Sequence, residues 1–72
     1  MRSNISMATE KQVSYALALM ARAGFRTDWM SAEHKELGAK MRERSGRVVD
    51  WLASMDRQRI SELIDDLKSR VG

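Results

Sequence analysis

The feature that most limits the fold is a stripe of large aliphatic residues near the end of the chain. Four of them follow the i, i+3, i+4, i+7 spacing of one helix face: Ile60, Leu63, Ile64 and Leu67. Asp56 precedes the stripe and is a favourable N-cap residue, because its carboxylate can accept hydrogen bonds from the free N–H groups of the first turn. The pattern predicts an amphipathic helix from Arg57 to about Ser69.

A second amphipathic helix is predicted near the start of the chain. Thr9 and Gln12 have the spacing of a capping box, in which each side chain bonds to the backbone N–H of the other residue. The helix should run from Glu10 to about Ala23, and Gly24 should end it in a left-handed conformation. Its apolar stripe consists of Val13, Ala16, Leu17, Met20 and Ala23, widened by Tyr15 and Leu19.

The middle of the chain carries weaker helical patterns. We expect a helix from Asp28 or Ser31 to about Arg44, although Gly38 inside it costs about 1 kcal/mol relative to alanine. A break follows, and residues 47–54 should form a short helix. The residues of this short helix that should face inward are Val48, Trp51 and Leu52.

Together these elements predict an all-α fold, a small orthogonal bundle of three to four helices. Residues 9–72 should form a single helical domain, and residues 1–8 a flexible N-terminal arm. The chain has no proline, and no alternation of polar and apolar residues indicates a strand. The first and last helices should pack together through Val13, Leu17, Met20, Ile60, Leu63, Ile64 and Leu67.

Size and composition exclude several classes of protein. Seventy-two residues leave little room for a deep catalytic cleft, and no motif combines a nucleophile, a base and an oriented partner. We therefore expect a protein that is not an enzyme and needs no cofactor. The absence of cysteine excludes disulfides and thiolate metal sites and favours a cytoplasmic location. The longest weakly polar stretch, Val13 to Ala21, is too short to cross a bilayer, so no membrane partner is expected.

His34 is the only histidine and the first residue to consider for a metal site or a general base. Glu33 and Glu36 lie nearby, but a direct neighbour in sequence points to another side of a helix. No second histidine completes a zinc shell. We therefore expect no metal site, and a structural histidine that is exposed or partly buried.

The strongest functional candidate is a basic segment in the middle of the chain. Residues 40–59 hold six basic and three acidic side chains, which accounts for the whole net charge of +3. Arginine side chains fork onto phosphate oxygens, and a helix start nearby offers free N–H groups. Alternatively, the segment is a solvated face whose charges complement a helix dipole. The candidate nucleic-acid contacts are Lys40, Arg42, Arg44, Arg47, Arg57 and Arg59.

Aromatic residues add a second group of candidates. Tyr15 and Trp29 are candidates for stacking on exposed bases. With Met30 they are also candidates for contact with a protein partner. Trp51 lies three residues after Val48, which assigns it to the core. The six methionines either form an adaptable partner groove or fill an irregular core.

Two segments resemble the ends of a short helical module. They are Thr9–Tyr15, running on to Ala23–Phe25, and Ile60–Lys68. Modules of this pattern recur in proteins of actinobacteria and their phages, often appended to DNA recombination, strand-annealing or helicase-type proteins. The resemblance covers most of residues 8–69, and Arg42–Arg47 departs from it. It implies association with DNA-handling machinery and implies no catalytic residue.

We therefore expect a non-catalytic, nucleic-acid-associated binding module of DNA metabolism. Its partner would be DNA, bound weakly and in a salt-dependent way, or a protein of the DNA-handling machinery. The alternative is a protein–protein adaptor or dimerisation domain, for example a phage-encoded regulator of a host protein. Such an adaptor would use an exposed patch of methionine and tryptophan, and a homodimer is compatible with it.

Overall fold

The computed structural model describes residues 7–72, so most of the expected N-terminal arm lies outside the described residues. The last two residues of that arm contact the domain. Met7 pairs with Asp56 in an isolated antiparallel bridge, and the Ala8 N–H donates to the Met55 carbonyl at 2.9 Å. Among the described residues, Met7 and Ala8 therefore contact the domain, although they were expected to belong to the arm.

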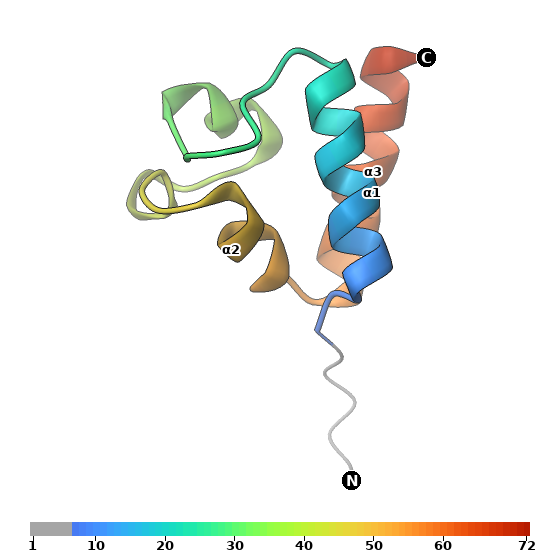
Figure 1. Ribbon diagram of the computed structural model, residues 1–72, viewed down its shortest axis with the longest axis horizontal. Helices are drawn as coiled ribbons and strands as arrows, with labels where there is room; N and C mark the ends of the chain where they lie inside the picture. Colours follow the sequence, from blue (N-terminus) through green and yellow to red (C-terminus); the bar gives the residue numbers. More distant parts are fainter. Residues whose placement is uncertain (1–6) are drawn as a thin grey trace, which may run out of the picture.

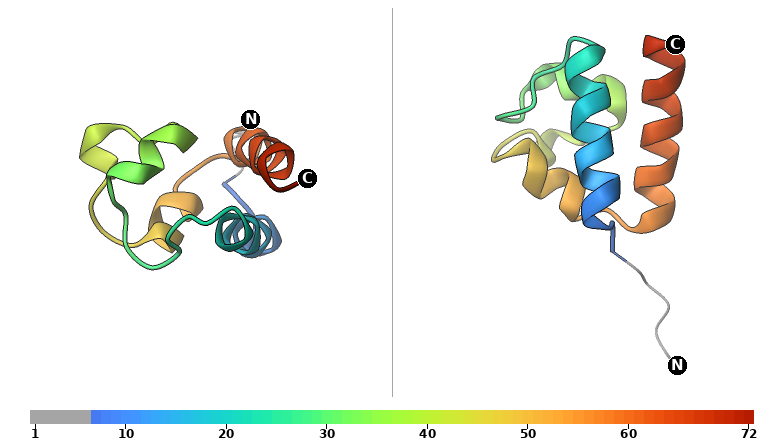
Figure 2. Two further views of the ribbon diagram at one scale, coloured as in Figure 1. Left: turned by 90° about the horizontal axis from the view of Figure 1, so that it is seen from above. Right: turned by 45° about the vertical axis from the view of Figure 1, so that its right-hand side comes forward.

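The described chain is all-α, as predicted (Figure 1). Its α-helices are α1 (Glu10–Arg22), α2 (Val48–Ala53) and α3 (Arg57–Val71), and two 3₁₀ helices, η1 (Ala32–Leu37) and η2 (Met41–Glu43), precede α2. Helices α1 and α3 lie side by side and run in the same direction (Figures 1 and 2). The segment between them, with η1, η2 and α2, forms a second layer beside this pair.

Both long helices begin where the capping residues predict. The Thr9 hydroxyl accepts from the Gln12 N–H at 3.0 Å, and the Gln12 side-chain oxygen accepts from the Thr9 N–H at 3.0 Å. At the start of α3, the Asp56 carboxylate accepts from the Arg59 N–H at 2.7 Å. These bonds satisfy backbone donors that the helices themselves leave free. The sequence therefore specifies these two starts locally.

The end of α1 also follows the prediction. Gly24 is left-handed, with φ of +91°, and its N–H donates to the Ala21 carbonyl at 3.2 Å. The Phe25 N–H reaches back to the Met20 carbonyl at 2.9 Å. This pair of bonds is a Schellman motif, which turns the chain away from the helix axis.

The predicted second helix, from Asp28 or Ser31 to Arg44, is wrong. The structure has two separate 3₁₀ helices there, divided by Gly38, which is left-handed with φ of +91°. The Ala39 N–H donates to the His34 carbonyl at 3.2 Å, which closes η1 as Gly24 closes α1. The glycine that was expected to be tolerated inside a helix is in fact a helix stop.

The core lies where the three α-helices and η1 meet. The buried residues on α1 and α3 include most of the predicted contacts, whereas Leu17 is only half-buried at the edge of the core. Trp51 is buried, as predicted. The buried hydrophobic residues are Val13, Ala16, Leu19, Met20, Met30, Leu37, Ala39, Val48, Trp51, Leu52, Met55, Ile60, Leu63, Ile64 and Leu67.

Candidate nucleic-acid interface

The loop before α2 (residues 40–47) is joined to the loop after α1 (residues 23–31) by two backbone hydrogen bonds. The Met30 N–H donates to the Gly46 carbonyl at 2.8 Å, and the Val48 N–H donates to the Asp28 carbonyl at 2.9 Å. This pairing places residue 29 directly opposite Arg47 in an isolated antiparallel bridge. Two segments that are 18 positions apart in sequence therefore form one surface.

Trp29 is the aromatic residue of this surface. Its side chain is exposed, with 54% of the residue accessible, and the Arg47 guanidinium lies 5.6 Å from the centre of its ring. A cation over an indole face is attracted by the negative face of the ring. The bridge thus brings one predicted stacking residue and one predicted phosphate contact together.

Met30 does not belong to this surface, which corrects the expectation that it contacts a partner. Only 6% of Met30 is exposed, and it packs in the core. Neighbouring residues in an extended backbone point to opposite sides. Trp29 therefore points outward, and Met30 points inward.

Glu43 is the only acidic residue between Lys40 and Arg47, and its carboxylate bonds within the loop. It accepts from the Lys40 backbone N–H at 2.8 Å. This bond, followed by the nearby Trp51 indole N–H, holds the pKa of Glu43 below its ordinary value of 4.5. The Glu43 side chain therefore stays ionised at neutral pH and stabilises the loop that carries the basic residues.

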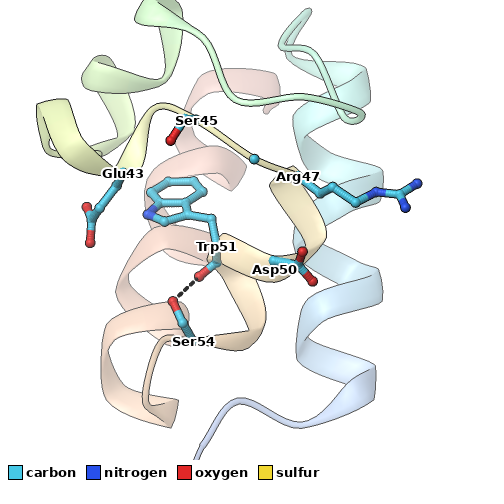
Figure 3. A pocket seen from close by; sticks show the side chains of 7 residues that line it. Glu43, Ser45, Arg47, Asp50, Trp51 and Ser54 are labelled. Atoms are coloured by element: carbon cyan, nitrogen blue, oxygen red, sulfur yellow. Dashed lines mark hydrogen bonds between the residues drawn. The ribbon is translucent and has the colours of Figure 1, made fainter.

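A shallow hollow of about 230 Å³ lies between this loop and α2 (Figure 3). Glu43, Asp50 and Arg47 line it together with the edge of Trp51, and the Arg47 guanidinium points away from Glu43 and Trp51. Two carboxylates repel a phosphate. The hollow is therefore unsuited to phosphate, and the outward basic side chains are the better candidates.

The six predicted basic residues do not form one cluster. Arg44 and Arg59 are half-buried and donate to backbone carbonyls, Arg44 Nε to Ala39 at 3.3 Å and Arg59 Nη2 to Gly38 at 3.2 Å. These two arginines help to hold the 3₁₀ segment in place. Lys40, Arg42, Arg47 and Arg57 are exposed, the last of them in the first turn of α3.

Tyr15, the other predicted stacking residue, lies on a different surface. It is 45% exposed on α1, and the Lys68 ammonium of α3 lies 5.7 Å from its ring centre. The structure thus gives Tyr15 an aromatic–cation pair of the same kind as Trp29 and Arg47. That pair belongs to the α1/α3 layer and not to the loop before α2.

The expectation that His34 is exposed or partly buried is wrong, because its side chain is fully buried. Its Nδ1 lies 3.0 Å from the Ser31 N–H, which is always a donor, so Nδ1 must accept. Its Nε2 lies 3.0 Å from the Arg26 carbonyl, which is always an acceptor, so Nε2 must carry the proton. The His34 side chain therefore bonds to both ends of the segment from residue 26 to residue 31.

Asp28, which was expected only as a possible helix start, and Arg26, which was not singled out, also belong to this surface. The Arg26 guanidinium donates twice to the Asp28 carboxylate, with both distances 3.1 Å, and the Trp29 N–H donates to it at 2.7 Å. The bond from Arg26, followed by that from Trp29, lowers the pKa of Asp28 from 3.8 to about 2. An aspartate just before the tryptophan was the available signal, since aspartate often accepts from a nearby backbone N–H in turns.

An apolar hollow of about 330 Å³ lies on another face, between the first half of α1 and α2. Its walls are mostly aliphatic, and Val49 in it is 39% exposed. The residues that line it are Ala8, Glu10, Val13, Ser14, Leu17, Val49 and Ala53.

Within residues 7–72, no cluster of histidine, aspartate and glutamate side chains is suited to a metal ion. No helix in this part of the chain is both long and apolar enough to cross a membrane. Comparisons with protein-family models, with curated proteins and with solved structures each found no match for this chain.

Proposed function

We propose that this chain is a non-catalytic nucleic-acid-binding module that contacts phosphates through the loop before α2. The observation that carries the proposal is the arrangement of charge in this loop. Lys40, Arg42 and Arg47 are exposed, whereas the one intervening carboxylate, Glu43, bonds to the loop backbone. The loop therefore presents outward cations on a backbone that is already fixed, so binding a phosphate orders their side chains but does not have to order the loop.

DNA is the expected ligand. Its phosphate backbone supplies closely spaced negative charges, and neutralising them releases counterions. Phosphate contacts hold a protein on the strand but carry no sequence information. Binding through these three cations should therefore be weak, salt-dependent and nearly independent of sequence.

A salt titration of fluorescently labelled DNA tests the proposal. Three phosphate contacts predict a slope of log affinity against log salt of about −2 to −3. A loop variant with Lys40, Arg42 and Arg47 all replaced by Gln should lose most of this slope and bind much more weakly. Arg44 and Arg59 are kept, because their hydrogen bonds to the backbone would confuse a loss of binding with a loss of structure.

The matched control makes the same charge change elsewhere. It replaces three exposed basic residues outside the loop: Lys11, Arg22 and Lys35. If the loop is the site, the control should keep most of the salt slope of the wild-type protein. Equal losses in the two variants would show a general charge effect, and no salt-sensitive binding by the wild type at micromolar concentration would refute the proposal.

A protein–protein adaptor is the second candidate, and the apolar hollow between α1 and α2 favours it. The hollow has aliphatic walls, and Val49 in it is partly exposed. A partner that covers this surface removes apolar atoms from water, which favours binding. Val49→Asp would place a charge in this hollow. If the adaptor function is correct, this variant should lose a protein partner while its binding to DNA is unchanged.

A further inference from the structure

We infer that Trp29 and Arg47 form a stacking platform that makes the module prefer single-stranded over double-stranded nucleic acid. The inference rests on the proposed function and adds the class of ligand. The indole of Trp29 is exposed, with 54% of the residue accessible, although burial of so large an aromatic side chain would stabilise a small domain. Trp51, by comparison, is 6% exposed.

The backbone fixes this exposure on both sides of Trp29. The residues before and after it bond to Val48 and Gly46, and the Trp29 N–H itself donates to Asp28. The adjacent Met30 fills the core position of this segment. Trp29 therefore cannot turn inward without breaking the bridge and removing Met30 from the core.

His34 holds the same loop from inside. Its two ring nitrogens bond to the Arg26 carbonyl and to the Ser31 N–H, at 3.0 Å each, and so hold the backbone on both sides of Trp29. The backbone that carries Trp29 is therefore ordered before a ligand binds, so less entropy is lost on binding. His34 is therefore a positioning residue for the platform and is not in contact with the ligand.

The chemistry of the platform fits an unpaired base beside its phosphate. An indole stacks on the face of any base, and a duplex hides these faces within its own stack. The Arg47 guanidinium lies over one face of the Trp29 ring, 5.6 Å from its centre, so a base would stack on the opposite face with a cation close by. Further cations, Lys40 and Arg42, are exposed in the same loop. A partner that combines flat faces with regular negative charge is a single strand.

The experiment compares a labelled oligothymidine with a blunt duplex of the same length at one salt concentration. The wild-type protein should bind the single strand more tightly. Trp29→Leu, which keeps an apolar side chain without a flat face, should weaken single-strand binding roughly 5- to 150-fold, the range for loss of one base stack. Duplex binding should change less than about twofold, because it depends on phosphate contacts alone. Trp29→Phe should retain most of the single-strand affinity.

Tyr15→Leu is the matched control, since Tyr15 has similar exposure and also has a cation over its ring. It should leave both affinities unchanged, and circular dichroism should show that all three variants remain folded. Salt-sensitive binding that is equal for both ligands, or unaffected by Trp29→Leu, would overturn the inference and leave the proposed function standing. If the wild-type protein binds neither ligand, the proposed function fails as well, and Trp29 becomes a candidate contact for a protein.

Discussion

Replacing His34 by Phe tests whether the two side-chain hydrogen bonds of His34 hold the 26–31 loop in place. Phe fills a similar volume, but it leaves the Ser31 N–H and the Arg26 carbonyl without the partner that each has at 3.0 Å. An unpartnered buried polar group costs about 1–3 kcal/mol. Ser31 is half-buried and Arg26 exposed, so water replaces part of the loss. We therefore expect the variant to lose about 2–3 kcal/mol of unfolding free energy.

This loss is large for so small a domain. At 0.05–0.15 kcal/mol per residue, the total stability is on the order of 4–11 kcal/mol. His34→Ala should be worse than His34→Phe, because truncating a large buried ring adds a cavity, with a typical total cost of about 3–5 kcal/mol. The Ala variant should be largely unfolded if the domain lies at the lower end of this range.

Urea unfolding followed by circular dichroism measures these differences, with equal slopes as the check that unfolding stays two-state. Two further variants separate the hydrogen bonds. Asn has an oxygen near the place of Nδ1 and should restore the bond to Ser31, whereas Gln has an amide nitrogen near the place of Nε2 and should restore the bond to Arg26. Both should fall between wild type and Phe. If the unfolding free energy of the Phe variant is within about 0.5 kcal/mol of wild type, the two hydrogen bonds do not stabilise the loop, because substitutions at exposed positions stay in that range.

Two other predictions concern the loops. Gly24→Ala and Gly38→Ala should each cost about 1–2 kcal/mol, because both glycines are left-handed. Gly38→Ala should cost more in urea unfolding, because its Cβ would lie 2.7 Å from Arg59 Nη2 and displacing this group breaks its bond to the Gly38 carbonyl. Gly24 has open space, so equal costs would contradict this role of Arg59. The pKa values of Asp28 and Glu43 are lowered, so their ionised side chains stabilise the fold at a pH above the ordinary pKa values of 3.8 and 4.5. This contribution should be lost as the pH falls below those values, for Asp28 toward about 2. The D28N, E43Q double variant should therefore show a flatter dependence of the urea midpoint on pH over this range, and an unchanged dependence would rule out these two groups.

The two long helices could be predicted from the sequence because their signals are local. Thr9 and Asp56 cap the helices through residues three positions away, and the aliphatic stripe of α3 repeats with the helical period. Gly24 ends α1 by bonds within six residues. Such contacts depend on neighbouring residues and need no knowledge of the rest of the fold.

The middle segment could not be predicted in the same way, because distant residues hold it. Arg59 bonds to the Gly38 carbonyl across 21 positions, and Arg70 bonds to the Glu36 carbonyl across 34. Gly38 itself ends η1 through bonds between neighbouring residues, as Gly24 ends α1, but the packed α3 holds the segment around it in place. The candidate surface has the same limitation: the pairing of Trp29 with Arg47 follows from the bridge, and no local pattern indicates it.

The bridge between Trp29 and Arg47 also separates two parts of the molecule that differ in their stability against local opening. It closes the chain between residues 30 and 46 into a loop, whose 3₁₀ helices have shorter and weaker hydrogen-bond ladders than α1 and α3. This segment supplies three of the fifteen buried hydrophobic residues, Met30, Leu37 and Ala39, so it can open as a unit while the long helices keep most of their packing. Its amide hydrogens should then exchange at a lower free energy than those of the α1/α3 pair. The least stable part of the domain would thus be the part that carries the exposed cations, and a ligand held there would slow this opening in proportion to its affinity.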